Sequence, residues 1–402
     1  MRLGRPLNLL LLALGAMFLQ QTFASIGRYM PPVIAPAIIE DLHFDAAWVG
    51  IYVGLGAASA LAVQLGCGSF ILRYGALRMS QVALVLLAAG LAAAATGSLW
   101  MFALSAIIGG GGSAASTPAS SHLLGRYSPP RYAPLVFSLK QTAVPAGLLL
   151  LGLLGPLFTG WGGWQFSLVM AALGCLVFAV MLQPLRREFD SDRIPSKRFR
   201  MSDFGTTLKV VLRTRELRHL SAACFAFNGL QTVFTAYFVV FLTDMGHSLA
   251  EAGLVFSVAT FVAVPCRILW GWVGSTRAAP GPMLGMLAVG MAAGTVLVGL
   301  SGAHWPLALV GLVASILSAT ALSWHGVLLA ETARLAPEGN RGGATGGVLS
   351  FGQTGALLMP VFYAGILALT GSHGIGFICC GVPALVVGVA LLRPAHGPQS
   401  PG

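Results

Sequence analysis

Charge is scarce in this sequence, and negative charge is scarcest. Of 402 residues, 9% are charged, and Asp plus Glu number 12 against 23 Lys plus Arg. Hydrophobic residues make up 56% of the chain, and the mean hydropathy is +0.83. A soluble domain could not cover that much apolar surface with so few polar groups. The composition therefore excludes a soluble globular protein and is typical of a multi-pass membrane protein.

Cysteine is also rare, and its spacing fits neither a disulfide framework nor a zinc site. The six cysteines all lie in apolar stretches, where we interpret them as small packing residues: Cys67, Cys175, Cys224, Cys266, Cys379 and Cys380. We expect no metal and no cofactor. The sequence pI near 9.9 could suggest nucleic acid. However, the basic residues lie in short loops beside apolar segments, as topology signals do, so we expect no nucleic-acid partner.

Twelve apolar segments are long enough to span a bilayer, which takes about 20 residues. They cover residues 8–37, 47–71, 79–97, 99–123, 134–159, 163–182, 217–242, 249–273, 281–301, 304–330, 343–369 and 374–393. The first segment begins like a signal peptide at Leu7–Ala16, but it continues as apolar chain, so we interpret it as a retained helix. Pro31, Pro32 and Pro36 predict a kink in its outer part.

One long polar stretch, residues 183–216, divides the chain into residues 1–182 and 217–402. We predict two six-helix bundles joined by a basic, partly helical linker at the membrane surface. The two halves also repeat: residues 137–143 match residues 349–355, and Gln21-Thr22 resembles Gln231-Thr232. The fold class is therefore an all-α membrane protein of twelve transmembrane helices in two pseudo-symmetric bundles, the layout of many transporters.

Basic residues set the orientation, because Lys and Arg concentrate in cytoplasmic loops. Outside three apolar segments, every Lys and Arg lies in a tail, in the linker or in a loop on one side. We therefore predict that both termini are cytoplasmic in a bacterial-type inner membrane. The chain is expected to work as a monomer in the lipid bilayer.

Three cations remain inside apolar segments: Arg28, Lys140 and Arg267. Each costs roughly 2.5–3.5 kcal/mol on insertion scales. No acidic residue lies at a comparable depth, so we predict that an anionic ligand neutralises them. The alternatives are that Lys140 extends to the membrane surface, that Arg28 pairs with Glu40 or Asp41, and that Arg267 serves packing.

Amide and hydroxyl groups near these cations could orient a carboxylate or hydroxylated ligand. The repeat places Gln141 and Gln353 in opposite halves, where we expect them to face each other across a cavity. Further candidates for substrate binding are Gln21, Asn228, Gln231 and Tyr237. Interhelical hydrogen bonds are the alternative role for each of them.

His325 and Glu331 are the candidate proton carriers, since no other titratable pair lies near the membrane interior. Glu331 has an alternative role as an ion-pair partner at the cytoplasmic rim. The run Gly109–Ser113 lacks the Gly-Lys-Ser/Thr of a phosphate-binding loop, so we assign it to close helix packing.

The loop after the second segment carries Gly68, Arg73, Gly75 and Arg78. With these residues the chain resembles the major facilitator superfamily over nearly its whole length. That family's signature there is Gly-x-x-x-Asp-Arg-x-Gly-x-Arg, and the four residues match it as a gating motif. Leu72 replaces the acidic residue, and Ser275 replaces an Asp in the equivalent stretch of the second half. The resemblance implies twelve helices and alternating access.

A second resemblance concerns the first segment, where Arg28 precedes Val33–Ala37 and Asp41-Leu42. This order is similar to the anion:cation symporter branch, in which the arginine holds a substrate carboxylate. That branch has an Asp-Arg pair where this chain has Gly27-Arg28. The cyanate, monocarboxylate and organic-anion porters are further possible relatives.

These features together predict a secondary transporter of a small organic anion, most simply a carboxylate, coupled to protons. Anion exchange is the close alternative, because buried acids are scarce. Drug-type efflux is a second alternative, although no acidic residue is visible for a cationic drug. No catalytic constellation can be assembled, so we expect neither an enzyme nor a non-transporting sensor.

Overall fold

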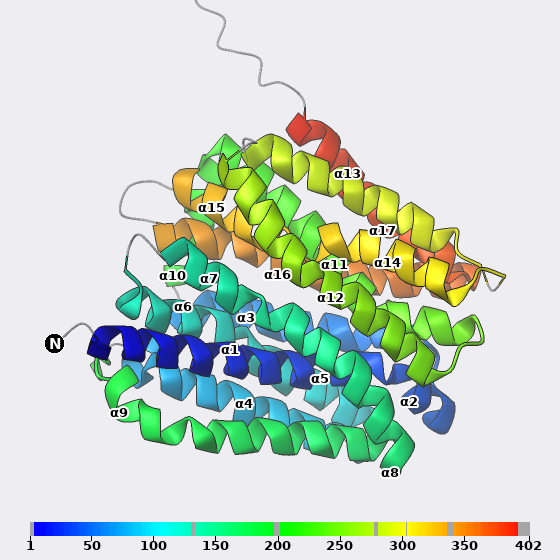
Figure 1. Ribbon diagram of the computed structural model, residues 1–402, viewed down its shortest axis with the longest axis horizontal. Coiled ribbons are helices and arrows are strands. Elements are labelled where there is room, and N and C mark those ends of the chain that lie inside the picture. The colour runs from blue at the N-terminus through cyan, green and yellow to red at the C-terminus, as the bar shows by residue number, and fades with distance from the viewer. Residues whose placement is uncertain are drawn as a thin grey trace, which may run out of the picture.

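The computed structural model describes residues 4–129, 133–196, 202–276, 280–302, 304–335 and 341–392. Within these ranges the regular structure is entirely helical (Figure 1). The helices are α1 (Gly4–Val33), α2 (Ala35–Leu42), α3 (Trp48–Tyr74), α4 (Ala76–Ala94), α5 (Leu99–Ala114), α6 (Ser116–Tyr127), α7 (Ala133–Gln141), α8 (Ala143–Met181), η1 (Gln183–Leu185), α9 (Arg186–Phe189), α10 (Ser202–Arg213), α11 (Arg215–Asp244), α12 (Leu249–Thr276), α13 (Pro280–Gly299), α14 (Leu307–Ala321), α15 (His325–Leu335), α16 (Arg341–Thr370) and α17 (His373–Leu392).

Eleven helical stretches among the described residues are long and apolar enough to cross a membrane. One of them, Leu139–Phe189, is 51 residues long, about twice what a bilayer needs. It contains a turn at Gly162 and Gly163, where the backbone leaves helical geometry. Figure 1 shows α8 folding back on itself there. This stretch therefore corresponds to two of the predicted spans, and the fold class predicted from the sequence is confirmed.

Several predicted spans are interrupted. The first ends as α1 at Val33, next to Pro31 and Pro32, and continues as the short helix α2, so the predicted kink is confirmed. The fourth divides into α5 and α6, the fifth into α7 and the first arm of α8, and the tenth into α14 and α15. Each of these breaks interrupts the regular hydrogen-bond pattern of a helix within a predicted span. Such irregular backbone is tolerated at membrane depth where it is buried or lines a cavity.

Helices α1 to α8 pack mainly on one another, as do helices α11 to α17. We call these groups the N-terminal bundle and the C-terminal bundle. Within them, α1 packs on α8, α11 packs on α16, and α13 packs on α17. The bundles meet mainly along two helix pairs, α3 with α16 and α8 with α12. In the sequence between the two bundles, the described part of the linker forms η1, α9 and α10.

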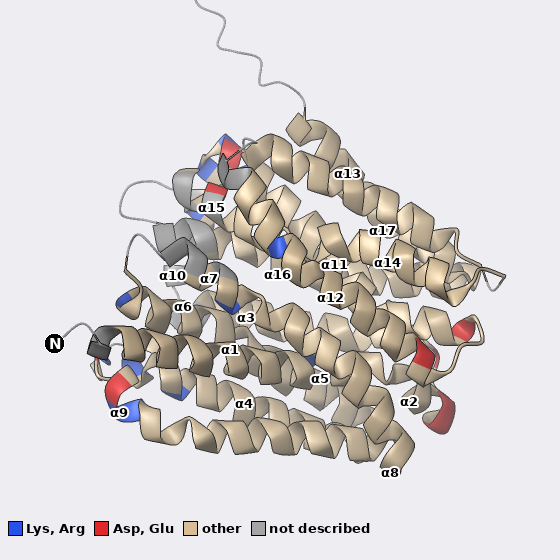
Figure 2. Ribbon diagram, in the orientation of Figure 1, with Lys and Arg blue, Asp and Glu red and all other residues tan. Residues whose placement is uncertain are grey.

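The two ends of the helices differ in charge (Figure 2). Apart from Arg28, Lys140 and Arg267, the described Lys and Arg residues gather at the end where the N-terminus, α9 and α15 lie, which we call the basic end. The opposite end, with α2 and the turns 43–47 and 245–248, carries acidic residues and no described Lys or Arg. We call it the acidic end; its acids are Glu40, Asp41, Asp45, Asp244 and Glu251.

The bundles are in close contact at the acidic end. A Cβ atom on Gly50 of α3 would overlap the Tyr237 hydroxyl and the Pro360 carbonyl of the C-terminal bundle. Across the other helix pair, Ser257 of α12 donates a hydrogen bond of 2.8 Å to the carbonyl of Leu149 in α8. Since the helices touch at their backbones, no space is left between them there. This acidic-end seal places any central cavity nearer the basic end.

Candidate functional site

A polar cavity of about 130 Å³ lies between the two bundles. Along α3, Gly50 belongs to the acidic-end seal, whereas Gln64 lines the cavity. The polar or charged residues of its lining are Gln21, Ser25, Arg28, Tyr29, Gln64, Ser113, Thr117, Gln141, Asn228, Gln231, Thr232, Arg267, Trp324, His325 and Gln353. Both bundles therefore contribute, and eight of the predicted site residues meet here.

Helix α1 supplies one side of the cavity through residues on one face. Gln21, Ser25 and Arg28 are spaced four and three residues apart, which aligns them along a helix. The Gln21 side-chain carbonyl accepts hydrogen bonds from Thr117 (3.3 Å) and from the Lys140 ammonium (3.2 Å). Gln21 thus connects the cavity lining to a cation that lies behind it.

Lys140 is almost fully buried, with 1% of its surface exposed. It does not line the cavity, and its hydrogen-bond partner is Gln21. The alternative that Lys140 extends to the membrane surface does not hold in this structure, because its side chain points inward. Burying an ammonium without a carboxylate is costly, so an anion near Lys140 would stabilise its charged form.

Arg267 of α12 lines the cavity and bridges the bundles. Its guanidinium donates to the carbonyl of Gln141 in α7 and to that of Leu322 (2.6 Å) after α14. Both acceptors are carbonyls at helix breaks, which would otherwise lack partners. Arg267 therefore has a structural role, and its positive charge is still not neutralised by these bonds.

Arg28 has more of its guanidinium available than Arg267. Its described contact is with the ring of Tyr29, whose centroid lies 5.5 Å from the guanidinium carbon. No hydrogen bond or ion pair joins it to any described residue. Arg28 also lines a smaller space of about 30 Å³ beside the cavity. Its planar set of donors suits bidentate binding of a carboxylate.

Carboxylates are absent from the described lining of the cavity. The ion pairs among described residues lie near the two ends: Asp192 with His122 and Arg126, Asp190 with Arg186, and Asp244 with His373. Among the described residues, neither Glu40 nor Asp41 forms an ion pair with Arg28. The described lining of the cavity therefore holds two arginines and no carboxylate.

The C-terminal bundle contributes amides and an imidazole. Gln231 accepts a hydrogen bond of 3.2 Å from the Trp324 indole, and Asn228 donates one of 2.8 Å to the carbonyl of Gly352. In contrast, the Gln353 side-chain carbonyl and His325 Nδ1 are buried without a partner. Such atoms are costly unless a ligand or water satisfies them. They extend the potential binding surface opposite Arg28.

Two predicted site residues lie elsewhere. Tyr237 is fully buried in the acidic-end seal, where its hydroxyl faces α3. Glu331 lies buried in α15 and is not among the residues that line the cavity. Conversely, sequence reasoning missed Gln64, Thr117 and Trp324. A single amide within an apolar segment is the signal that could have found Gln64.

The gating-motif residues lie at the basic end, where α3 meets α4. Gly75 has φ 99°, and a Cβ there would overlap the Asp190 carboxylate. That carboxylate accepts hydrogen bonds from the backbone N–H groups of Leu77 (2.8 Å) and Arg78 (3.1 Å). Burial raises the pKa of Asp190, although these N–H groups and Arg186 oppose the shift. Asp190 thus brings a carboxylate to this loop, in which Leu72 stands where the family signature has an Asp. Gly68 and Arg73 lie in the last turns of α3.

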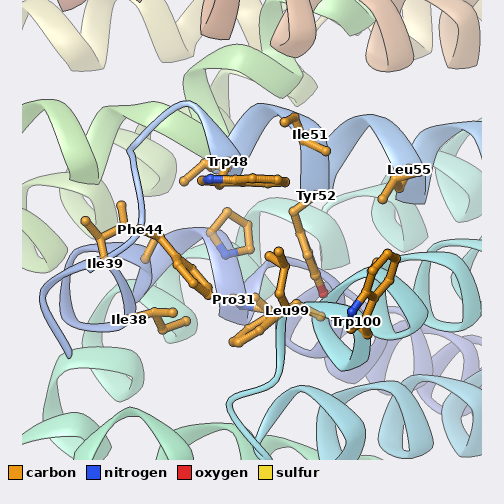
Figure 3. A pocket seen from close by; sticks show the side chains of 15 residues that line it. Pro31, Ile38, Ile39, Phe44, Trp48, Ile51, Tyr52, Leu55, Leu99 and Trp100 are labelled. Carbon is orange, nitrogen blue, oxygen red and sulfur yellow. The ribbon is translucent and has the colours of Figure 1, made fainter. Parts of the chain in front are cut away.

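A second, apolar pocket of about 210 Å³ lies near the acidic end of the N-terminal bundle (Figure 3). Trp48, Trp100, Phe44 and Pro31 surround it, and the Tyr52 hydroxyl bonds to Ser105 (3.2 Å). No charged side chain lines this pocket, so it offers no binding group for an ion. The polar cavity is therefore the candidate binding site.

Comparison with known proteins agrees with this architecture. A family model described as Major Facilitator Superfamily matches residues 17–332. No curated protein sequence matches the chain.

Solved structures share the fold at low identity. A bacterial homologue of the human lysosomal transporter Spinster, in an inward-facing and occupied conformation, has 16% identity and a TM-score of 0.69, with 94% of each chain covered. A POT family transporter in complex with 5-aminolevulinic acid has 14% identity and a TM-score of 0.75, covering 94% of this chain and 95% of that one. A peptide transporter POT in complex with sulfate has 17% identity and a TM-score of 0.74, covering 94% and 93%.

Proposed function

Because this chain belongs to the Major Facilitator Superfamily, we propose that it is a secondary transporter that moves a small organic anion by alternating access. The observation that supports this proposal is the charge of the cavity. Arg28 and Arg267 line it, Lys140 lies behind Gln21, and no described carboxylate neutralises them. A carboxylate is the preferred substrate class, since the guanidinium of Arg28 can bind it with two parallel hydrogen bonds.

Each group of the cavity has a proposed role. Arg28 binds the carboxylate, and Gln141 and Gln353 orient the rest of the substrate from opposite bundles. Lys140 raises the positive potential from behind Gln21. Loading an anion lowers the electrostatic energy of all three cations. A ligand that stabilises the closed arrangement of the bundles more than the open one drives the change of access.

The coupling ion is part of the proposal. Proton symport is the first choice, with His325 and Glu331 as candidate carriers; His325 faces the cavity with an unpaired ring nitrogen. Exchange of one anion for another is favoured by the lack of carboxylates in the described cavity lining. We place the chain in a bacterial-type inner membrane with the basic end in the cytoplasm, following the distribution of Lys and Arg. Two solved structures of this fold carry an acid and an anion, 5-aminolevulinic acid and sulfate, which fits the proposed class.

The test is uptake of labelled monocarboxylates, dicarboxylates and sugar acids into proteoliposomes. We expect one class to show saturable uptake, and Arg28→Gln to reduce it about tenfold or more, because a charge-assisted hydrogen bond contributes roughly 1.5–3 kcal/mol. Lys140→Gln should also lower uptake. The matched control is Arg187→Gln, which removes one positive charge from an exposed position at the basic end.

Two further measurements separate the alternatives. Equal transport of cations by wild type and by the Arg28→Gln, Lys140→Gln double variant would refute an anionic substrate. Jumps of external pH, with and without anion inside the vesicles, distinguish symport from exchange. A thermal-shift screen of anions is a first step, because a ligand that binds the folded state raises the melting temperature.

A further inference from the structure

Tyr237 connects the two bundles at the acidic-end seal. It lies on α11 with no exposed surface, and its hydroxyl is 3.5 Å from the carbonyl of Ala47, just before α3. The hydroxyl also fills the space where Gly50 has no side chain. The position of the Tyr237 ring therefore determines how closely α3 can approach the C-terminal bundle.

A chain of contacts leads from this ring to the aqueous phase. Tyr237 packs on Tyr363 of α16, with ring centroids 4.1 Å apart. The Tyr363 hydroxyl is 2.7 Å from His373 Nδ1, at the start of α17. His373 Nε2 is 2.7 Å from a carboxylate oxygen of Asp244, at the end of α11. His373 is 7% exposed and Asp244 is 56% exposed, so the carboxylate gives the imidazole contact with water.

Both protonation states of His373 can satisfy every group in this chain. A carboxylate only accepts, so in the neutral state Nε2 carries the proton and donates to Asp244. Nδ1 then accepts a hydrogen bond from the Tyr363 hydroxyl. When Nδ1 takes up a second proton, it donates to the Tyr363 oxygen. The Tyr363 hydroxyl then donates to the carbonyl of His373, 3.4 Å away. Neither state leaves a buried polar atom without a partner.

Titratable groups face His373 and its tyrosine neighbours from several helices. Asp244 faces His373 from α11, and Tyr363 faces it from α16. Cys380 of α17 lies near Tyr237 and Tyr363. Asp45, before α3, is the acidic neighbour of Tyr237 from the N-terminal bundle. The other close neighbours are the aromatic rings of Phe241 and Tyr237. The described part of the acidic end holds no Lys or Arg that would repel an imidazolium.

We infer that His373 is a proton-binding site that is loaded through Asp244 from the aqueous phase at the acidic end, and that its protonation tightens the acidic-end seal. Protonation of His373 adds Coulomb attraction between the imidazolium and the Asp244 carboxylate to the hydrogen bond that the neutral imidazole already donates. The protonated pair therefore holds the start of α17 to the end of α11 and keeps Tyr363 and Tyr237 against α3. This site is separate from the polar cavity, and its role does not depend on which substrate the cavity binds.

The test measures the seal directly, without substrate. Spin labels are placed on Trp100→Cys in α5 and Leu369→Cys in α16, which are 80% and 88% exposed at the acidic end of different bundles. The full chain, with its native cysteines replaced, is studied in lipid nanodiscs by electron-spin distance measurements between about pH 5 and pH 8. We expect the long-distance population to fall on acidification, by about fivefold, the lower end of usual coupling between sites.

Three variants and two controls decide the outcome. His373→Gln should abolish the pH response, and Asp244→Asn should move it to lower pH, because the imidazolium loses its counter-ion. Tyr363→Phe should raise the long-distance population at every pH. His304→Gln and Glu251→Gln change an exposed imidazole and an exposed carboxylate at the same end, and both should respond like wild type.

A wild-type seal that does not respond to pH would overturn the inference, as would an unchanged response in His373→Gln. If His373→Gln fails to fold, the exposed Asp244→Asn tests the same inference, and an unshifted response in that variant would overturn it. Failure of anion uptake alone would leave this result intact, since no substrate enters the measurement.

Discussion

Asp190 illustrates how a single side chain from the linker completes a loop of the N-terminal bundle. Its carboxylate caps the start of α4 by accepting from the backbone of Leu77 and Arg78, and Gly75 leaves the room that it needs. Carboxylates near a helix N-terminus are stabilising, because they satisfy free N–H groups and favour the helix dipole. The linker is therefore part of the bundle structure at this point as well as a connection.

The burial of Asp190 predicts that wild type and Asp190→Asn differ in thermal stability by an amount that depends on pH. The pKa of Asp190 is raised from 3.8 in the folded state because burial disfavours its charge. Folding therefore favours the protonated form of Asp190. This contribution to the free energy of unfolding is complete below pH 3.8 and is lost as the pH rises through the raised pKa. We expect Asp190→Asn, which cannot ionise, to gain melting temperature relative to wild type as pH rises from that value towards neutral. Thermal unfolding in detergent across this range measures the difference; a difference that is flat or falls with pH would contradict it.

Some residues of the site could be predicted from sequence because their cost in a membrane is visible without a structure. Arg28, Lys140 and Arg267 are cations in apolar segments, and the structure places the two arginines in the lining of one cavity and Lys140 behind it. The His373–Asp244 pair could not be predicted in this way. The two residues are 129 positions apart, and each lies at a helix end, where charged and polar groups are common. Their pairing depends on how α11 and α17 pack.

At the scale of elements, the breaks within spans place the polar groups of the site. Thr142 separates α7 from α8, and its hydroxyl bonds to the carbonyl of Leu139 (2.6 Å). Pro145, four residues after Gln141, has no N–H to donate, so the carbonyl of Gln141 is free to accept from Arg267. Hydropathy predicted where each span lies, because it averages over a window. It could not predict these breaks, because a change of backbone conformation at one residue does not alter the mean hydropathy of the window.

The turn inside α8 gives a prediction for a single glycine. Gly163 has φ 79° and ψ 176°, a conformation that is essentially restricted to glycine and costs an L-residue roughly 1–3 kcal/mol. Gly163→Ala should therefore lower the free energy of unfolding by about that amount and loosen the contact between the two arms of α8. Gly160→Ala, three residues earlier, is the matched control, because a Cβ there meets no atom within 4 Å. Equal melting temperatures for the two variants would refute the role assigned to Gly163.

At the scale of the whole molecule, the bundles touch through residues without side chains. A Cβ on Gly253 of α12 would overlap the carbonyl of Gly152 in α8 and the ring of Pro156. Gly50 holds the corresponding position in the α3–α16 contact. Close backbone approach of this kind is typical of helix packing in membranes. At these glycine contacts, few side chains would have to repack for the bundles to separate.

Adding one methyl group at this contact should shift the whole molecule towards an arrangement open at the acidic end. Overpacking costs about 1–3 kcal/mol, so Gly253→Ala should raise the ratio of open to closed molecules roughly five- to hundredfold. Labels at Trp100→Cys and Leu369→Cys report this as a larger long-distance population. Gly365→Ala on α16 is the control, since a Cβ there meets nothing within 4 Å. The shift should persist in His373→Gln, because the two changes act on the seal through different helix pairs; loss of the shift in that background would mean that the α8–α12 contact acts through the His373 site.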